Sequence, residues 1–287
     1  MSVVELAHWA LSGAGHLGLA LMAGAWLAQA RAPGWADRAR RAIGRTAALG
    51  WGISLAAAMA GLWSEAASMA DVGFTEAGPA VQQMLSTTHY GRAWTVATLA
   101  LFGALPWVLR TRPRLPALAA LAVYAYARSL FGHAGADGDW TWQAASAAVH
   151  LLLISVWCGE VLLTGWVVLR GDTPAPTFAS YLAAVSRSAT WALAGLVLTG
   201  LANGAFVSGF APFSLSGAYQ TLLLAKLALV AAAALLGGAN RFLLLPRLDT
   251  SPRARRLCLL ILRGESLLLL ATLVMASILA ATPPHPD

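Results

Sequence analysis

Apolar runs long enough to cross a lipid bilayer recur along the whole chain. A spanning helix needs roughly 20 consecutive apolar residues, because each residue advances about 1.5 Å and the hydrocarbon core is about 30 Å thick. Eight such runs are present, near residues 5–30, 42–67, 90–109, 115–131, 140–169, 178–207, 218–245 and 257–281. The pattern predicts a bundle of eight transmembrane helices.

The composition indicates an all-α integral membrane protein. Of the 287 residues, 59% are hydrophobic and 11% are charged, whereas soluble domains carry about 25% charged residues. Proline and polar residues interrupt the connections between the runs. The longest polar gap, about residues 63–89, has room for a short loop helix at most. We therefore expect a single transmembrane helical domain over residues 1–287.

Arginine predicts the orientation of this bundle. Arginines collect in the connections after the first, third, fifth and seventh runs: Arg31, Arg38, Arg40, Arg41, Arg45, Arg110, Arg112, Arg114, Arg170, Arg241, Arg247, Arg253, Arg255 and Arg256. Cytoplasmic loops of membrane proteins carry such an excess of positive residues. Both termini are therefore expected on the periplasmic, outer side.

The opposite, outer side is acidic. It holds Glu5, Glu65, Asp71, Glu76, Asp137, Asp139 and Asp287, against Arg92 and Arg128. The net charge of +7 therefore describes cytoplasmic loops beside anionic membrane lipid, and it gives no support to nucleic-acid binding. An acidic outer side attracts cations.

Several chemistries are excluded or disfavoured by missing motifs. A Walker A loop, His-Glu-x-x-His and Gly-x-Ser-x-Gly are absent, which disfavours ATP-driven pumps and hydrolases. The absence of Cys-x-x-Cys-His excludes covalent c-type haem. Cys158 and Cys258 are too few for a disulfide framework, so we expect free thiols. Close helix contacts are predicted by glycines in the first two runs: Gly13, Gly15, Gly18, Gly24, Gly50, Gly52 and Gly61.

All six histidines fall on the outer side or in the outer half of the bundle. Four lie at membrane ends or in outward segments: His8, His89, His133 and His285. His16 lies within the first run, roughly 10 Å below Trp9 if that residue marks the outer aromatic belt. His150 lies at a similar depth, roughly 12 Å below Trp142. The two buried histidines could therefore meet.

These histidines are candidate copper ligands. His8 and His16 are about 12 Å apart along one helix and cannot share an ion, so a surface site above a buried site is expected. Thioether together with imidazole favours copper over hard cations. The candidate ligands are His16, His150, His133, His89, His8, Met59 and Met275. The structural alternative is packing for the methionines and hydrogen-bonded core positions for the histidines.

A second polar set is expected deeper in the bundle, toward the cytoplasm. It consists of Glu160, Arg187 and Glu265 in three different runs, and Lys226 lies at the depth of the buried histidines. The favoured interpretation is an ion-pair network that joins helices. The alternative is a proton or cation exit path that also passes Cys158 and Cys258. Lys226 could hold a carboxylate, cap carbonyl groups or be uncharged.

The chain also carries a series of short motifs in a fixed order. They are Thr88-His89-Tyr90-Gly91-Arg92, Ser129-Leu130-Phe131-Gly132-His133-Ala134, His150-Leu151-Leu152 with Trp157-Cys158-Gly159, Leu198-Thr199-Gly200, Tyr219 with Lys226, Asn240-Arg241 with Pro246, and Glu265 with Pro283-Pro284. With these the chain resembles the copper resistance protein D (CopD) family of bacterial inner-membrane proteins. The resemblance implies copper import or export and a periplasmic copper-binding partner. Cys158 and Glu160 depart from the small residues usual at those positions.

Three functions are compatible with these features. The first is copper transport and resistance, with copper, as Cu(I) or Cu(II), bound by the histidines of the outer half. The second is a membrane oxidoreductase in which His16 and His150 are the axial ligands of a b-type haem. The third is a docking protein for a periplasmic copper chaperone that transports nothing itself.

Overall fold

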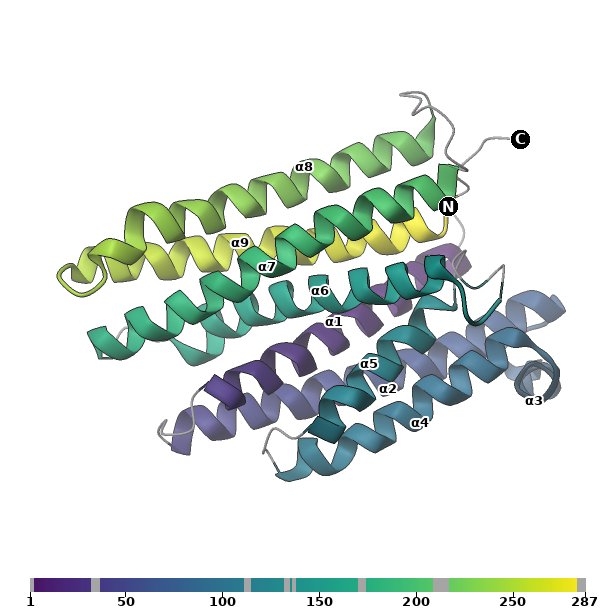
Figure 1. The fold of residues 1–287 in the computed structure, drawn as a ribbon. Helices are drawn as coiled ribbons and strands as arrows, with labels where there is room; N and C mark the ends of the chain where they lie inside the picture. The colour runs from purple at the N-terminus through teal and green to yellow at the C-terminus, as the bar shows by residue number, and fades with distance from the viewer. Residues whose placement is uncertain are drawn as a thin grey trace.

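The computed structural model describes residues 3–31, 37–110, 115–131, 135, 138–169, 174–208 and 217–282, and every regular element in these ranges is helical (Figure 1). The α-helices are α1 (Val3–Arg31), α2 (Asp37–Ala70), α3 (Gly78–Thr87), α4 (His89–Arg110), α5 (Leu115–Ser129), α6 (Trp142–Leu163), α7 (Ala175–Ser208), α8 (Ala218–Ala239) and α9 (Pro252–Ala280). Short 3₁₀ or π segments are η1 (Phe74–Glu76), η3 (Thr164–Val168), η4 (Asn240–Leu244) and η5 (Leu245–Arg247).

Seven of these helices are long and apolar enough to cross a membrane: α1, α2, α4, α6 with η3, α7, α8 with η4 and η5, and α9. The eighth expected segment is α5, which has 15 residues and is therefore only about 22 Å long, shorter than the hydrocarbon core. The all-helical membrane architecture is thus confirmed, with seven full-length candidate spans. The loop helix expected in the longest polar gap is α3.

The helices form two groups around a central pair (Figure 1). α1 and α6 lie side by side in the middle, with α2, α4 and α5 on one side and α7, α8 and α9 on the other. α7 packs on α6 and α8 packs on α9, whereas α7 and α8 have little direct contact with each other over their described residues. The central pair therefore joins the two groups.

Glycine allows the two central helices to touch backbone to backbone. A Cβ at Gly159 of α6 would overlap the carbonyl oxygen of Ala20, and one at Gly24 of α1 would overlap the backbone of Gly159. In a membrane, where lipid is as apolar as the side chains, helices associate largely through such close packing. The prediction of tight contacts is confirmed for Gly24.

The contact between α1 and α2 is built in the same way. A Cβ at Gly18 would lie 2.6 Å from the Gly50 carbonyl oxygen, and one at Gly50 would lie 2.7 Å from that of Gly18. The prediction was wrong for Gly52 and Gly61, since neither has a neighbouring atom within 4 Å of its Cβ position. A glycine in an apolar helix thus marks a contact only where that face meets another helix.

α1 begins and α9 ends at the same end of the bundle (Figure 1). We call this the outer end, after the orientation that the arginines predict, and the opposite end, where α1, α4 and α8 finish, the inner end. Arg31 ends α1 and Arg110 ends α4. The arrangement agrees with termini on one side of the membrane.

The glycine contact leads to a stability prediction. Gly159→Ala places a methyl group against the backbone of α1, which cannot move aside without separating the central pair, so we expect destabilisation at or above the upper end of the roughly 1–3 kcal/mol typical of overpacking. The midpoint of thermal unfolding in detergent measures it. Gly52→Ala is the matched control. Its Cβ meets open space, so its unfolding midpoint should be unchanged or slightly higher. Equal midpoints for the two variants would contradict the assignment.

Candidate functional site

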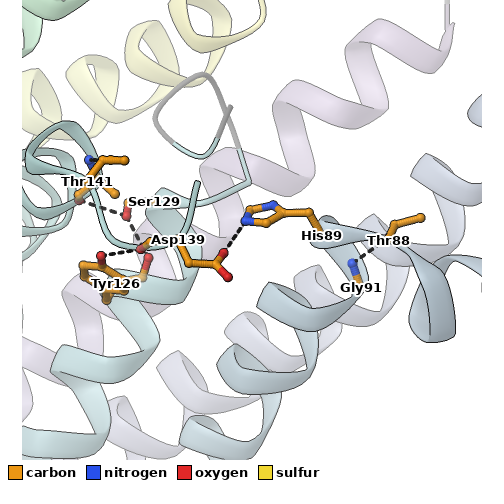
Figure 2. A network of polar contacts seen from close by, with 8 residues as sticks. Thr88, His89, Gly91, Tyr126, Ser129, Asp139 and Thr141 are labelled. Carbon is orange, nitrogen blue, oxygen red and sulfur yellow. Dashed lines mark hydrogen bonds and ion pairs between the residues drawn. The ribbon is translucent and has the colours of Figure 1, made fainter. Parts of the chain in front are cut away.

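His89 and Asp139 form a polar contact at the outer end (Figure 2). His89 begins α4, and its Nε2 contacts the Asp139 carboxylate just before α6. The position of His89 is fixed by Thr88, whose Oγ1 accepts the backbone N–H of Gly91 at 3.0 Å in the manner of an N-cap. The Tyr126 hydroxyl donates to the Asp139 carbonyl oxygen at 2.6 Å, which fixes the acidic partner.

A second imidazole–carboxylate pair lies on the neighbouring helices. Nδ1 of His8 on α1 lies 3.6 Å from Oε2 of Glu65 on α2. Both outer pairs are partly exposed, with 52% of the His8 side chain and 31% of the His89 side chain accessible. Within the described part of the chain, no three His, Cys, Asp or Glu side chains are grouped so that they could hold a metal ion. Each pair therefore offers two groups to a cation from outside.

The remaining predicted ligands are placed as follows. His133 and His285 lie outside the described residues. Met59 is on α2 with 51% of its surface exposed, and Met275 is partly buried on α9. An exposed side chain on a helix of this bundle points away from its interior, so Met59 is not placed to bind an ion between the helices.

His150 on α6 is held by a hydroxyl group of α7. Its Nδ1 lies 2.8 Å from Oγ1 of Thr199. Thr199 has a single hydroxyl proton, which it donates to the Gly195 carbonyl oxygen at 2.7 Å. With the Thr199 proton directed to Gly195, Nδ1 of His150 is the donor to Oγ1, and a neutral ring in this arrangement has its lone pair on Nε2.

His16 on α1 has the same arrangement with α9. Its Nδ1 lies 3.5 Å from Oγ of Ser277, which donates its own proton to the Leu273 carbonyl oxygen at 3.0 Å. This contact is long, but it involves the same ring nitrogen as the contact of His150. Neither Nε2 has a hydrogen-bond partner among the described residues. A histidine that donates through one ring nitrogen and leaves the other free is the form that binds a metal ion.

The two buried histidines face different neighbours. His16 contacts α9, whereas His150 contacts α7. Gly159, nine residues after His150, faces α1, and nine residues are two and a half helical turns. His150 is therefore on the side of α6 turned away from α1. Similar depth had suggested that the two histidines could meet, but their contacts place them on separate faces.

Two basic side chains lie near the buried histidines. Arg128 of α5 and Lys226 of α8 both act electrostatically on His16, and Lys226 also acts on His150. The Arg128 guanidinium lies 5.0 Å over the ring of Phe131. Lys226 has no hydrogen bond or ion pair with the other described residues. A copper ion at His16 therefore requires an uncharged Lys226 or an accompanying anion, because like charges repel.

Glu160 is the centre of a buried ion pair nearer the inner end. Its carboxylate, 2% exposed, contacts the guanidinium of Arg31 and the hydroxyl of Ser188. The prediction that Arg187 pairs with Glu160 was wrong. Arg187 is exposed, because Ser188 faces α6 and successive helix residues point about 100° apart. Arg31 was missed because it lies beside a proline-containing connection and so resembled a loop residue. The ion pair joins α1, α6 and α7.

Glu265 is not part of that ion pair. It is 2% exposed on α9, and its Oε1 accepts a hydrogen bond from the indole N–H of Trp157 at 3.0 Å. The predicted single network is therefore divided: Glu160 is paired with Arg31, Glu265 has no basic partner in the described ranges, and Lys226 pairs with neither. Cys158 and Cys258 are buried free thiols, as expected.

Removal of Arg31 tests the ion pair. Arg31→Met leaves the buried Glu160 carboxylate without its counter-charge, so we expect a loss of about 3–5 kcal/mol of folding stability. Arg31→Met with Glu160→Met should recover most of it, because apolar replacement of a whole buried pair is often neutral. Arg40→Met, which removes an exposed pair with Asp37, is the control and should unfold like the parent. An Arg31 variant as stable as the Arg40 variant would refute a structural role for the pair.

Two family models match the chain. The model of the copper resistance protein D-like N-terminal domain matches residues 3–142, which include His8, His16, Arg31 and His89. The model described as copper resistance protein D matches residues 179–279, which include Lys226 and Glu265. His150 and Glu160 lie between the two matched ranges. No curated protein and no solved structure matches the chain.

Proposed function

Because the chain belongs to the copper resistance protein D family, we propose that it transports copper across the bacterial inner membrane, binding the ion through histidines in its outer half. The family membership and the seven apolar helices make it a multi-pass copper resistance membrane protein. Transport and the binding residues are the proposed part. Copper is the substrate, carried as Cu(I) or Cu(II).

The hydrogen-bond contacts of the buried histidines are the observation that carries this proposal. Thr199 and Ser277 each donate their own proton to a carbonyl oxygen and lie beside an Nδ1, so a neutral ring donates from Nδ1 and keeps the lone pair of Nε2 for a ligand. A purely structural histidine would satisfy both ring nitrogens in the low-dielectric interior. Imidazole nitrogen is a good copper ligand. Since the two side chains face different helices, we assign them as successive positions rather than one shared site.

The two outer pairs are proposed to collect the ion. His8 with Glu65 and His89 with Asp139 each combine an imidazole and a carboxylate at the outer end. Their negative charge attracts a cation, and a pair that offers two groups binds an ion weakly enough to release it. In the proposed orientation this end faces the periplasm, where a copper-binding protein would deliver the metal.

Substitution of Thr199 tests the tautomer argument. Thr199→Val removes the acceptor for His150 Nδ1–H, so the ring loses its fixed tautomer, and we expect copper affinity at that position to fall about ten- to hundredfold, as for other hydrogen-bond partners of metal ligands. Isothermal titration of the purified protein with copper measures this. Thr272→Val is the matched control, since Thr272 is buried and bonds only the Leu268 carbonyl oxygen of its own helix.

The double variant His16→Ala, His150→Ala tests the ligands themselves. It should abolish tight copper binding while the protein remains folded, and full copper stoichiometry in this variant would refute the assignment. A Soret band after haem-replete expression would instead support the b-type haem alternative. Absence of copper flux into vesicles containing the purified protein would favour the docking alternative.

The outer pairs predict a kinetic effect. His8→Ala and His89→Ala should slow copper entry into vesicles at low copper concentration, because fewer ions are captured, and should leave the stoichiometry of the buried positions unchanged. Gln82→Ala, an exposed polar residue of α3 at the same end, is the control. Unchanged entry rates in both histidine variants would remove the outer pairs from the route.

A further inference from the structure

Two glutamates, Glu160 and Glu265, are buried in the described part of the chain, and they have opposite surroundings. Both are 2% exposed. Glu160 contacts a guanidinium and a hydroxyl group, so its negative charge is neutralised within the protein. Glu265 receives one hydrogen bond, from the Trp157 indole, which carries no charge. An unpaired carboxylate at this depth would cost several kcal/mol.

The other ionisable groups near Glu265 do not supply that missing charge. On α6 the neighbouring groups are Trp157 and the thiol of Cys158, and on α9 itself the thiol of Cys258; both thiols are within electrostatic reach of the carboxyl group. Neutral thiols cannot neutralise a carboxylate.

The arginines of the adjoining segments contact other groups. Arg263 of α9 donates to the Gly165 carbonyl oxygen and lies over the Trp166 ring. Arg241 of η4 donates to Ser186 and Thr190 of α7. Lys226 of α8 is eleven residues from Gly237, the α8 residue that faces Glu265, and this corresponds to about 16 Å along the helix.

α8 leaves room and polar groups for a protonated acid. At Gly237 a Cβ would lie 3.1 Å from Glu265 Oε1, so the carboxyl group lies close against the backbone of α8 at this position. Asn240 follows one turn later on the same face. It is 4% exposed, and neither its Oδ1 nor its Nδ2 has a hydrogen-bond partner among the described residues. It also begins the π-helical segment η4, and such segments are frequent at functional sites.

We propose that Glu265 is a proton-binding site of the transporter, which holds a proton in the resting protein and releases it when copper crosses the inner half of the bundle. This rests on the proposed copper transport. The O–H bond of the neutral acid breaks, the proton passes to water at the inner end, and the carboxylate left behind balances the positive charge of the passing ion. Nothing is oxidised or reduced. Rebinding of a proton from the outer side restores the resting state.

Infrared spectroscopy tests the resting state without copper. The purified protein at neutral pH should show the C=O stretching band of a protonated carboxylic acid, shifted by exchange into D₂O. Glu265→Gln should abolish this band, whereas Glu76→Gln, at an exposed residue of η1, should leave it. Trp157→Phe should keep the band but shift its frequency, since the indole hydrogen bond is lost. Absence of the band in the parent protein, or its persistence in Glu265→Gln, overturns the proposal.

Vesicles that contain the protein test the release step. If one proton accompanies each Cu(I) ion inward, a pH difference of one unit should change the copper accumulation ratio about tenfold in the parent protein. In Glu265→Gln this dependence should disappear, and in Glu76→Gln it should remain. Copper flux that is independent of pH in the parent protein overturns proton release but not copper transport. Absence of any flux refutes the proposed function, and the infrared result still decides whether Glu265 holds a proton.

Discussion

α1 and α6 approach until the backbone of Gly24 meets that of Gly159, a separation that residues with a Cβ would prevent. The other functional positions depend on this contact. Gly159 precedes Glu160 directly, and Arg31 lies two turns beyond Gly24, so the same approach brings the guanidinium to the carboxylate. It also fixes the direction of His150, on the far side of α6. Close packing of small residues, which membranes favour over hydrophobic burial, therefore organises both the ion pair and the histidines.

The polar groups of the bundle lie at three depths, and the charges are balanced differently at each depth. At the outer end, imidazoles stand beside carboxylates and remain accessible. In the outer half, two histidines contact hydroxyl groups and lie near Arg128 and Lys226, neither of which forms an ion pair with another described residue. Nearer the inner end, one glutamate is neutralised by an arginine and the other lacks a basic partner in the described ranges. A cation would meet negative, then positive, then protonatable surroundings in that order.

The spanning segments were predictable because the bilayer imposes a length that a run of residues either reaches or does not. Seven predicted runs are full-length helices, and their bounds differ from the prediction by a few residues; α5 is the short one, with 15 residues. The partners of the polar residues were harder to predict. Glu160 was expected to pair with Arg187, because both lie at similar depth, but depth says nothing about rotation around a helix axis. Ser188, one residue further, faces α6 instead.

The sequence by itself determined that this is an all-helical membrane protein, where its seven long apolar helices lie along the chain, and the family to which the chain is similar. These properties depend on length, hydropathy and local order, and the chain carries them without reference to its neighbours. Only the tertiary structure decided that Arg31 neutralises Glu160, that Glu265 has no basic partner in the described ranges, and that His16 and His150 face different helices. The reason is that lateral packing sets the rotation of each helix, through contacts between residues more than a hundred positions apart such as Ala20 and Gly159.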